Sequence, residues 1–136
     1  MANKVYPKFK KACINGGAST NLLTGVVKIA MVDTDAYTYD DAHEFLSDIP
    51  AGARISISGA LTSKAVTDGA AFQSANGRCD AVTGASVEGL VGFVDTGAAA
   101  TSRLIWFEDT TITGLPVTPA GASYNIIQPS AGWFVL

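Results

Sequence analysis

The sequence predicts a mainly β fold, in the form of a single-domain antiparallel β-sandwich or small barrel. Two observations favour this class. Residues 26–32, VVKIAMV, are β-branched and apolar on both faces, as in a central strand. The apolar runs 86–94 and 102–109 flank a loop of small residues and predict an antiparallel hairpin. A short N-terminal helix and a helical turn near 40–48 complete the predicted architecture.

The N-terminal segment, residues 1–17, is predicted to form a helix or arm ahead of a β-rich core at 26–136. Pro7 suits the first turn of this helix, and the glycine pair at 16–17 suits its end. Val5, Phe9 and Cys13 share one face of it, which we expect to be the buried face.

Further strands are expected on both sides of the central hairpin. Residues 54–58, RISIS, alternate so that Ile55 and Ile57 point inward and Ser58 points outward. Residues 65–75 form a weaker strand candidate, because Asp68 and Gly69 interrupt it.

The C-terminal third contains one loop and two strand candidates. Two prolines and two glycines in 113–121 predict a surface turn or a sheet edge. Strands are expected in 123–129 and 132–136, with Pro129 making the hairpin between them irregular. Because the segment ends on apolar residues, we expect the last strand to be paired and its side chains covered.

The segment YDDAHEF, residues 39–45, holds the single histidine among several acids. Asp40 or Asp41 suits the cap of a helical turn, and Phe45, Leu46 and Ile49 supply its buried side; the complete set predicted for this segment is Asp40, Asp41, His43, Glu44, Phe45, Leu46 and Ile49. A metal or acid–base site at His43 is the less favoured reading, because Asp40 and Glu44 share one helix face while His43 points elsewhere and could approach only Asp40, which is one contact and not a site.

The acids Asp33 and Asp35 resemble the start of a calcium loop. Counted from Asp33, the twelfth position is Glu44, as in an EF-hand, but the sixth is Thr38 where glycine is required. A simple turn is therefore the preferred interpretation. The chain also contains no nucleophile elbow and no glycine-rich phosphate loop. We expect no enzyme activity and no catalytic, cofactor-binding or metal-binding residue.

The composition limits the classes of partner. Only 15% of the 136 residues are charged, well below the usual share of about 25%. A surface this poor in charge is easier to understand if neighbouring proteins cover part of it. The net charge of −3 argues against nucleic-acid binding, and no apolar run is long enough to span a membrane. Cys13 and Cys79 are expected to be reduced thiols in a protein made in the cytoplasm.

Several segments together resemble small structural proteins of tailed bacteriophages and prophages. They cover most of the chain in order and are, as they stand here, YPKFKKACINGG, NLLTGVVKIAMVDT, DAYTYDDAHEFLSDIPAGARI, ALTSKAVTDGAAF, DTGAAATSRLIWFEDT and TGLPVTPAGASYNI. The resemblance implies a virion component, most simply a capsid cement or decoration protein that bridges major capsid protein subunits. A tail, baseplate or fibre protein is the alternative.

A cement role would place the protein on the capsid exterior after assembly in the host cytoplasm, in contact with the major capsid protein. Threefold positions in a shell favour a homotrimer. The expected contacts are the basic N-terminal segment and the loop at 113–121. The residues predicted to make these contacts are Lys4, Tyr6, Lys8, Lys10, Leu115, Pro116, Val117 and Pro119.

Overall fold

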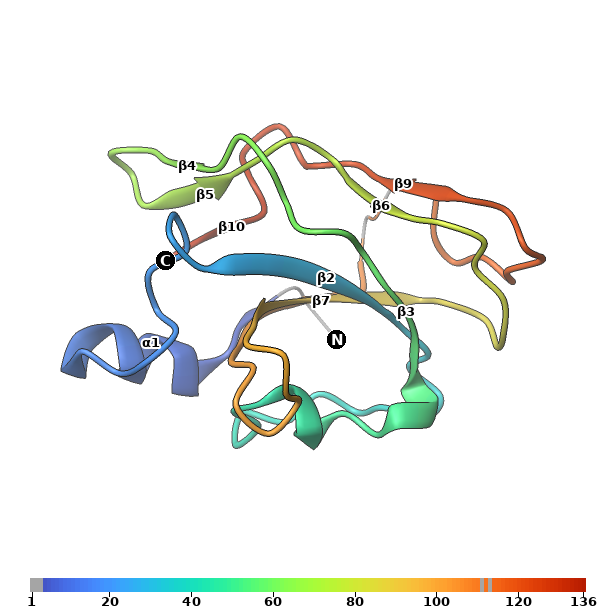
Figure 1. The fold of residues 1–136 in the computed structure, drawn as a ribbon, viewed down its shortest axis with the longest axis horizontal. Helices are drawn as coiled ribbons and strands as arrows, with labels where there is room; N and C mark the ends of the chain where they lie inside the picture. The colour runs from blue at the N-terminus through green and yellow to red at the C-terminus, as the bar shows by residue number, and fades with distance from the viewer. Residues whose placement is uncertain (1–3, 111, 113) are drawn as a thin grey trace.

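The computed structural model describes residues 4–110, 112 and 114–136. The chain is mainly β, with 34% strand and 11% helix, in antiparallel sheets. Two layers of strands lie over one another, and the helical segments cover the outer side of the larger layer (Figure 1). The predicted mainly β class is confirmed as a sandwich, since no closed barrel forms in the described part of the chain.

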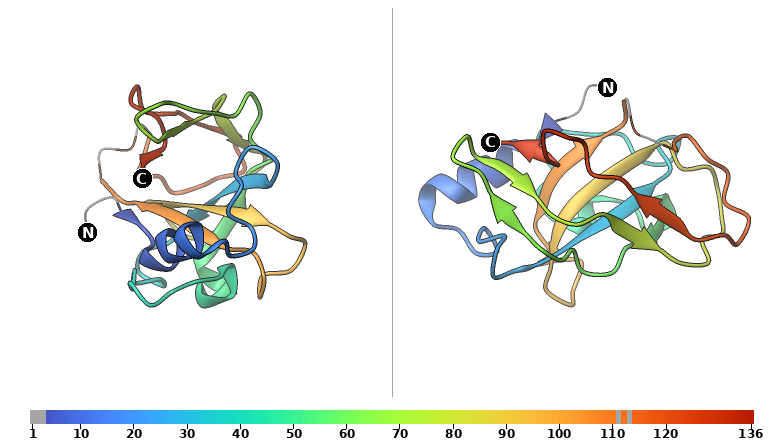
Figure 2. Two further views of the ribbon diagram at one scale, coloured as in Figure 1. Left: turned by 90° about the vertical axis from the view of Figure 1, so that its left-hand side faces the viewer. Right: turned by 90° about the horizontal axis from the view of Figure 1, so that it is seen from above.

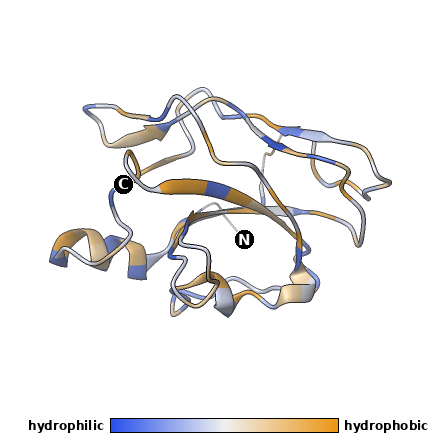
Figure 3. Ribbon diagram, viewed as in Figure 1, coloured by the Kyte–Doolittle hydropathy of each residue, from blue (hydrophilic) through white to orange (hydrophobic). Residues whose placement is uncertain are grey.

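The larger layer is a five-stranded antiparallel sheet in the order β1-β8-β7-β2-β3. Its strands are β1 (Lys4–Val5), β2 (Val26–Val32), β3 (Arg54–Ile57), β7 (Gly89–Asp95) and β8 (Leu104–Glu108). β2 has the predicted bounds, and β7 and β8 form the predicted hairpin. Figure 3 shows β2 as hydrophobic except for one hydrophilic stretch; its charged residue, Lys28, forms an ion pair of 2.7 Å with Asp95.

The smaller layer consists of short strands above this sheet (Figure 2). β4 (Ala65–Val66), β5 (Ala71–Gln73) and β10 (Phe134–Val135) form one small sheet, and β6 (Gly77–Cys79) pairs with β9 (Tyr124–Ile126) in another. The candidate at 65–75 is therefore two strands, turned at Asp68 and Gly69. The prediction of a C-terminal hairpin is wrong, because β9 and β10 belong to different sheets.

The opposite face of the larger sheet is covered by helix and loop. Helix α1 (Pro7–Asn15) begins at the predicted proline and ends at Gly16, whose φ of 71° is left-handed. It buries Phe9 and Ala12, so the described part of the N-terminal segment is packed on the sheet and is not a free arm. Two 3-10 helices, Leu46–Asp48 and Ala51–Ala53, lie beside it, and residues 40–45 form turns and an isolated bridge.

One hydrophobic cluster joins the layers, and Trp106 is among its largest fully buried side chains. The indole lies directly over Gly92, its partner across β7 and β8. A Cβ atom at Gly92 would lie 2.1 Å from the ring, so only glycine leaves room for it. On its other side the indole stacks on Trp133 with ring centroids 5.8 Å apart.

Two side chains of the 54–58 segment differ from the predicted burial. Ile57 is 42% exposed and Ser58 only 3% exposed, which reverses the expected alternation. The cause is a bulge, because Ser56 pairs with Met31 while Arg54 pairs with Val32 and one extra residue lies between them. Ser58 then accepts a hydrogen bond of 2.9 Å from the backbone N–H of Ile29.

The last residues are also more exposed than predicted. β10 is paired with β5 as expected, but Val135 is 57% exposed and Leu136 52% exposed. Val135 is the last residue of the two-residue strand β10, and Leu136 follows it. Both cysteines are free thiols, and burial raises the pKa of Cys13 and of Cys79. No described helix is long and apolar enough to cross a membrane.

Candidate functional site

The predicted N-terminal contact residues are only partly on the surface. Lys4 and Lys10 are exposed and Lys8 is half-buried. Tyr6 is fully buried, and its hydroxyl lies 2.7 Å from that of Tyr37. The prediction of Tyr6 as a contact residue is therefore corrected. Tyr6 comes directly after the edge strand β1, and its side chain is buried between the sheet and the segment after β2.

The predicted loop contacts are also divided. Pro116 is exposed and Leu115 half-buried, but Pro119 is buried and so is not a contact residue. Val117 is anchored by two backbone hydrogen bonds with Val87, of 2.7 and 3.0 Å. The loop is thus held by an isolated bridge as part of an ordered turn, and its free surface is smaller than the sequence indicated. Residue 113, where the predicted loop begins, lies outside the described residues.

The acids around His43 serve turns, but neither Asp40 nor Asp41 is the predicted cap: Asp40 accepts the N–H of Ala42 at 2.8 Å, and the 3-10 helix begins only at Leu46. Asp48 accepts hydrogen bonds from the backbone N–H groups of Glu44 and Phe45, at 2.8 and 3.0 Å. Burial alone would raise the pKa of Asp48, but these two bonds and nearby His43 outweigh it and lower the pKa. Glu44 forms an ion pair of 3.2 Å with Arg103.

His43 itself has a partner that the sequence did not indicate. Its Nδ1 atom lies 2.8 Å from the hydroxyl of Tyr37, which in turn contacts the hydroxyl of Tyr6. Burial raises the pKa of Tyr37 to about 12, so this phenol stays protonated at neutral pH. The imidazole therefore ends a partly buried hydrogen-bonded chain, which links the segments that cover the outer side of the larger sheet. Tyr37 and Tyr6 are visible in the sequence, but they precede His43 by 6 and 37 residues, and no local spacing predicts that these three side chains meet.

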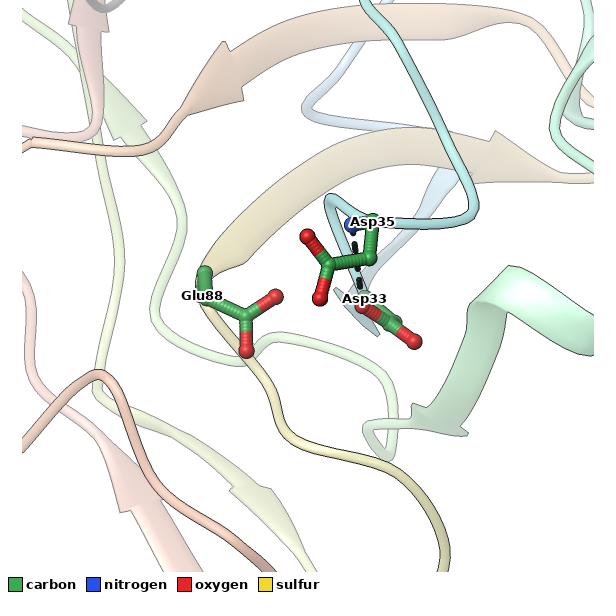
Figure 4. Close-up of side chains that lie close together, drawn as sticks. All are labelled: Asp33, Asp35 and Glu88. Carbon is green, nitrogen blue, oxygen red and sulfur yellow. Dashed lines mark hydrogen bonds between the residues drawn. The ribbon is translucent and has the colours of Figure 1, made fainter.

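Three acids come together where β2 ends. Carboxylate oxygens of Asp33, Asp35 and Glu88 all lie within 4.8 Å of one another (Figure 4). Asp33 accepts the backbone N–H of Asp35 at 2.9 Å, and Glu88 accepts the N–H and hydroxyl of Thr34 at 3.0 and 3.1 Å. These bonds confirm the predicted turn. Glu44, the residue at the twelfth position, is not part of this group.

An apolar groove, about 310 Å³ in volume, lies between α1, the turn after it, the β4–β5 hairpin and the C-terminus. Its floor includes Phe9, Phe72 and Phe134. The rim is made by Leu23, Val66 and Leu136, which are each 51 or 52% exposed. Close by, Ile14 on α1 is 88% exposed. The exposure of these rim residues was not predicted. The signal that the sequence offered was the presence of apolar residues in a turn and at the end of the segment.

A second hollow, the edge cavity, has a volume of about 520 Å³ and lies between β1 and β10. Aromatic side chains make much of its wall; they are Tyr39, Trp106, Phe107, Trp133 and Phe134. Its charged residues are Lys4, Lys10, Asp41 and Glu108.

Glu108 is unusual in this wall because it is only 5% exposed. Burial raises its pKa to about 7, and the nearby indole N–H of Trp106 opposes the rise without forming a hydrogen bond of good geometry. Glu108 is therefore partly protonated at neutral pH.

Comparison with known proteins does not assign the chain to a family. No family model matches it, and no curated protein is significantly similar to it.

Proposed function

We propose that this chain is a structural protein of a tailed-bacteriophage virion that works as a capsid cement or decoration protein. The observation that carries the proposal is the apolar groove with its exposed rim of Leu23, Val66 and Leu136. The resemblance of successive segments to small phage structural proteins supports the choice of virion, and the low content of charged residues agrees with a surface that neighbours cover.

The physical argument concerns exposed apolar area. Large apolar side chains gathered at one end of a soluble protein mark a contact surface, since leaving them in water is unfavourable. Here the rim side chains come from three separate segments, and the floor beneath them is fixed by core aromatics. A rigid sandwich with such an end can hold neighbouring subunits in a defined geometry. Its action is binding and not catalysis.

The partners in this proposal are the major capsid protein and further copies of the chain. Threefold positions of a shell would favour a homotrimer, because closed symmetry repeats one patch. The protein would lie on the capsid exterior. Sedimentation of the purified protein measures the trimer directly, and a monomer at all concentrations would remove that part of the proposal.

The central experiment is binding of the purified protein to expanded capsids of the source phage. We expect saturable binding and a higher temperature of capsid disruption. Replacing Leu23 and Leu136 with serine should abolish binding, because it makes the groove rim polar. Serine at Ile57 and Ile127, each 42% exposed and outside the groove, should leave binding unchanged.

Two outcomes would contradict the proposal. Equal binding by the groove and control variants would show that the groove is not the contact. Density for the protein in tail, baseplate or fibre, seen by cryo-EM of whole particles, would establish the alternative virion role and exclude cement.

A further inference from the structure

The edge cavity is bounded by the outer strands of two different sheets. β1 is the last strand of the five-stranded sheet, and β10 is the last strand of its small sheet. β1 pairs with β8 through Lys4 and Val5, and β10 pairs with β5 through Phe134 and Val135. Within the described residues no strand pairs with the outer edge of either, and the two strands contact each other beside the cavity. Each edge therefore offers the backbone groups of two residues to an added strand.

The cavity also has the size and lining of a binding site. Its volume of about 520 Å³ falls within the usual range for ligand sites. On the β10 side the wall is aromatic, with Trp133 and Phe134. On the side of β1 and α1 it carries Lys4 and Lys10. An extended chain places alternate side chains on opposite faces, so it can meet both walls at once.

The lining holds two lysines and two carboxyl groups, and its lysines are the groups that would attract an acidic occupant. Within the described residues neither Lys4 nor Lys10 has a carboxylate within ion-pair distance; Lys4 lies over the ring of Tyr39, 5.3 Å from its centroid. Asp41 is held by the hydroxyl of Tyr39 at 2.7 Å. Glu108 is buried beside the indole of Trp106 and is partly protonated, so it opposes the lysines only weakly.

We propose that the edge cavity binds an extended segment of a partner protein that carries acidic side chains at alternate positions. The segment adds as a strand beside β1 or β10, its carboxylates contact Lys4 and Lys10, and its apolar side chains pack on Trp133 and Phe134. This inference adds a second contact surface, apart from the apolar groove, and it rests on the proposed function for the identity of the partner.

A peptide titration of the isolated protein tests the site without any capsid. The probe is acetyl-Val-Glu-Val-Glu-Val-amide, and the control peptide has lysine in place of both glutamates. We expect the acidic probe alone to give saturable shifts of the backbone NMR signals of residues 4–5 and 134–135, with a change in tryptophan emission from the cavity wall. No saturable shift with the acidic probe, or equal shifts with both peptides, would overturn the proposal.

Charge reversal provides the matched comparison. Lys4→Glu with Lys10→Glu should weaken binding of the acidic probe about tenfold, as expected for the loss of two partly exposed ion pairs. Lys8→Glu with Lys11→Glu should not, because those residues line a separate polar hollow with Arg103. Equal loss in both pairs of variants would indicate a general charge effect and overturn the site. Peptide binding without capsid binding would uphold the site and reject the cement role.

Discussion

Strand β8 has an upper face toward the small sheets and a lower face toward the helical segments. Both faces are buried beneath aromatic side chains, but they are held in different ways. On the upper face Trp106 stacks on Trp133 and lies 5.4 Å from the ring centroid of Phe134. On the lower face Phe107 meets Tyr37 and Tyr39 at 6.1 and 5.4 Å between centroids. The upper contact depends on ring packing, whereas the lower one adds hydroxyl groups that need hydrogen-bond partners.

The difference follows from what covers each face. Short strands cover the upper face, and each pairs with a neighbour in its own small sheet. Turns and 3-10 helices cover the lower face, where the chain of hydroxyls from Tyr6 to Tyr37 to His43 supplies polar contacts between segments. A region without regular strands can thus be held firmly when its aromatic residues carry a polar atom.

The largest effect is expected on the upper face. Trp106→Ala should lower the free energy of unfolding by about 4 kcal/mol, because it removes a buried aromatic ring and leaves a cavity. Urea denaturation measures this change. A loss below about 1.5 kcal/mol would mean that the stacked rings contribute much less than their burial indicates.

Gly92→Ala tests the same contact in a double-mutant cycle with Trp106. Its Cβ would meet the indole at 2.1 Å, so the variant should be destabilised by about 2 kcal/mol as the ring is displaced. In a Trp106→Leu background the same change should cost less, with a coupling energy of about 1 kcal/mol. Additive effects would show that the glycine is required for another reason.

The next effect concerns pH and Glu108, also on the upper face. Folding raises the pKa of this carboxyl from its ordinary 4.5 to about 7, so the folded protein binds the extra proton. The contribution of the protonated carboxyl to the free energy of unfolding is fully present below about pH 4.5 and is lost as the pH rises through 7. Over this window wild type should lose about 3 kcal/mol relative to Glu108→Gln, since each pKa unit corresponds to about 1.4 kcal/mol.

Denaturation of both proteins from pH 4 to pH 8 measures that difference. Asp68→Asn, a change at an exposed turn residue, is the control and should track wild type. Parallel stability curves for wild type and Glu108→Gln would show that Glu108 is solvated in the folded protein.

The effects expected on the lower face are smaller than those of Trp106 and Glu108. Tyr37→Phe should cost about 2 kcal/mol, because both the Tyr6 hydroxyl and His43 Nδ1 lose their partner. Tyr6→Phe should cost about 1 kcal/mol, because Tyr37 keeps its contact with His43. Tyr124→Phe is the control, since its hydroxyl makes no hydrogen bond within the described residues. Equal losses for Tyr6 and Tyr37 would contradict a chain with Tyr37 in the middle.

Local pattern was enough to predict the longer elements. β2 follows from six apolar residues and one lysine, and α1 follows from Pro7 and Gly16 at its ends. β1 and β6 were not predicted, because two or three residues show no periodicity. β6 exists through pairing with β9, which lies some way along the chain.

The candidate contact surface was predicted less well. Lys4 and Lys10 were identified correctly as surface residues, because a lysine side chain is almost never fully buried without a partner. Tyr6 and Pro119 were assigned to the surface but are buried, and the groove rim of Leu23, Val66 and Leu136 was not foreseen. Each of these depends on whether a distant segment covers the residue.

The sequence by itself determined the β class, the central hairpin and the ends of the helix, because neighbouring residues set backbone preferences and turn geometry. Only the tertiary structure decided that Glu108 is buried, that His43 closes a chain from Tyr6, and that two sheet edges enclose a cavity. Burial, hydrogen bonding between distant side chains and the shape of a cavity are properties of pairs of segments, and no local pattern records which segments meet.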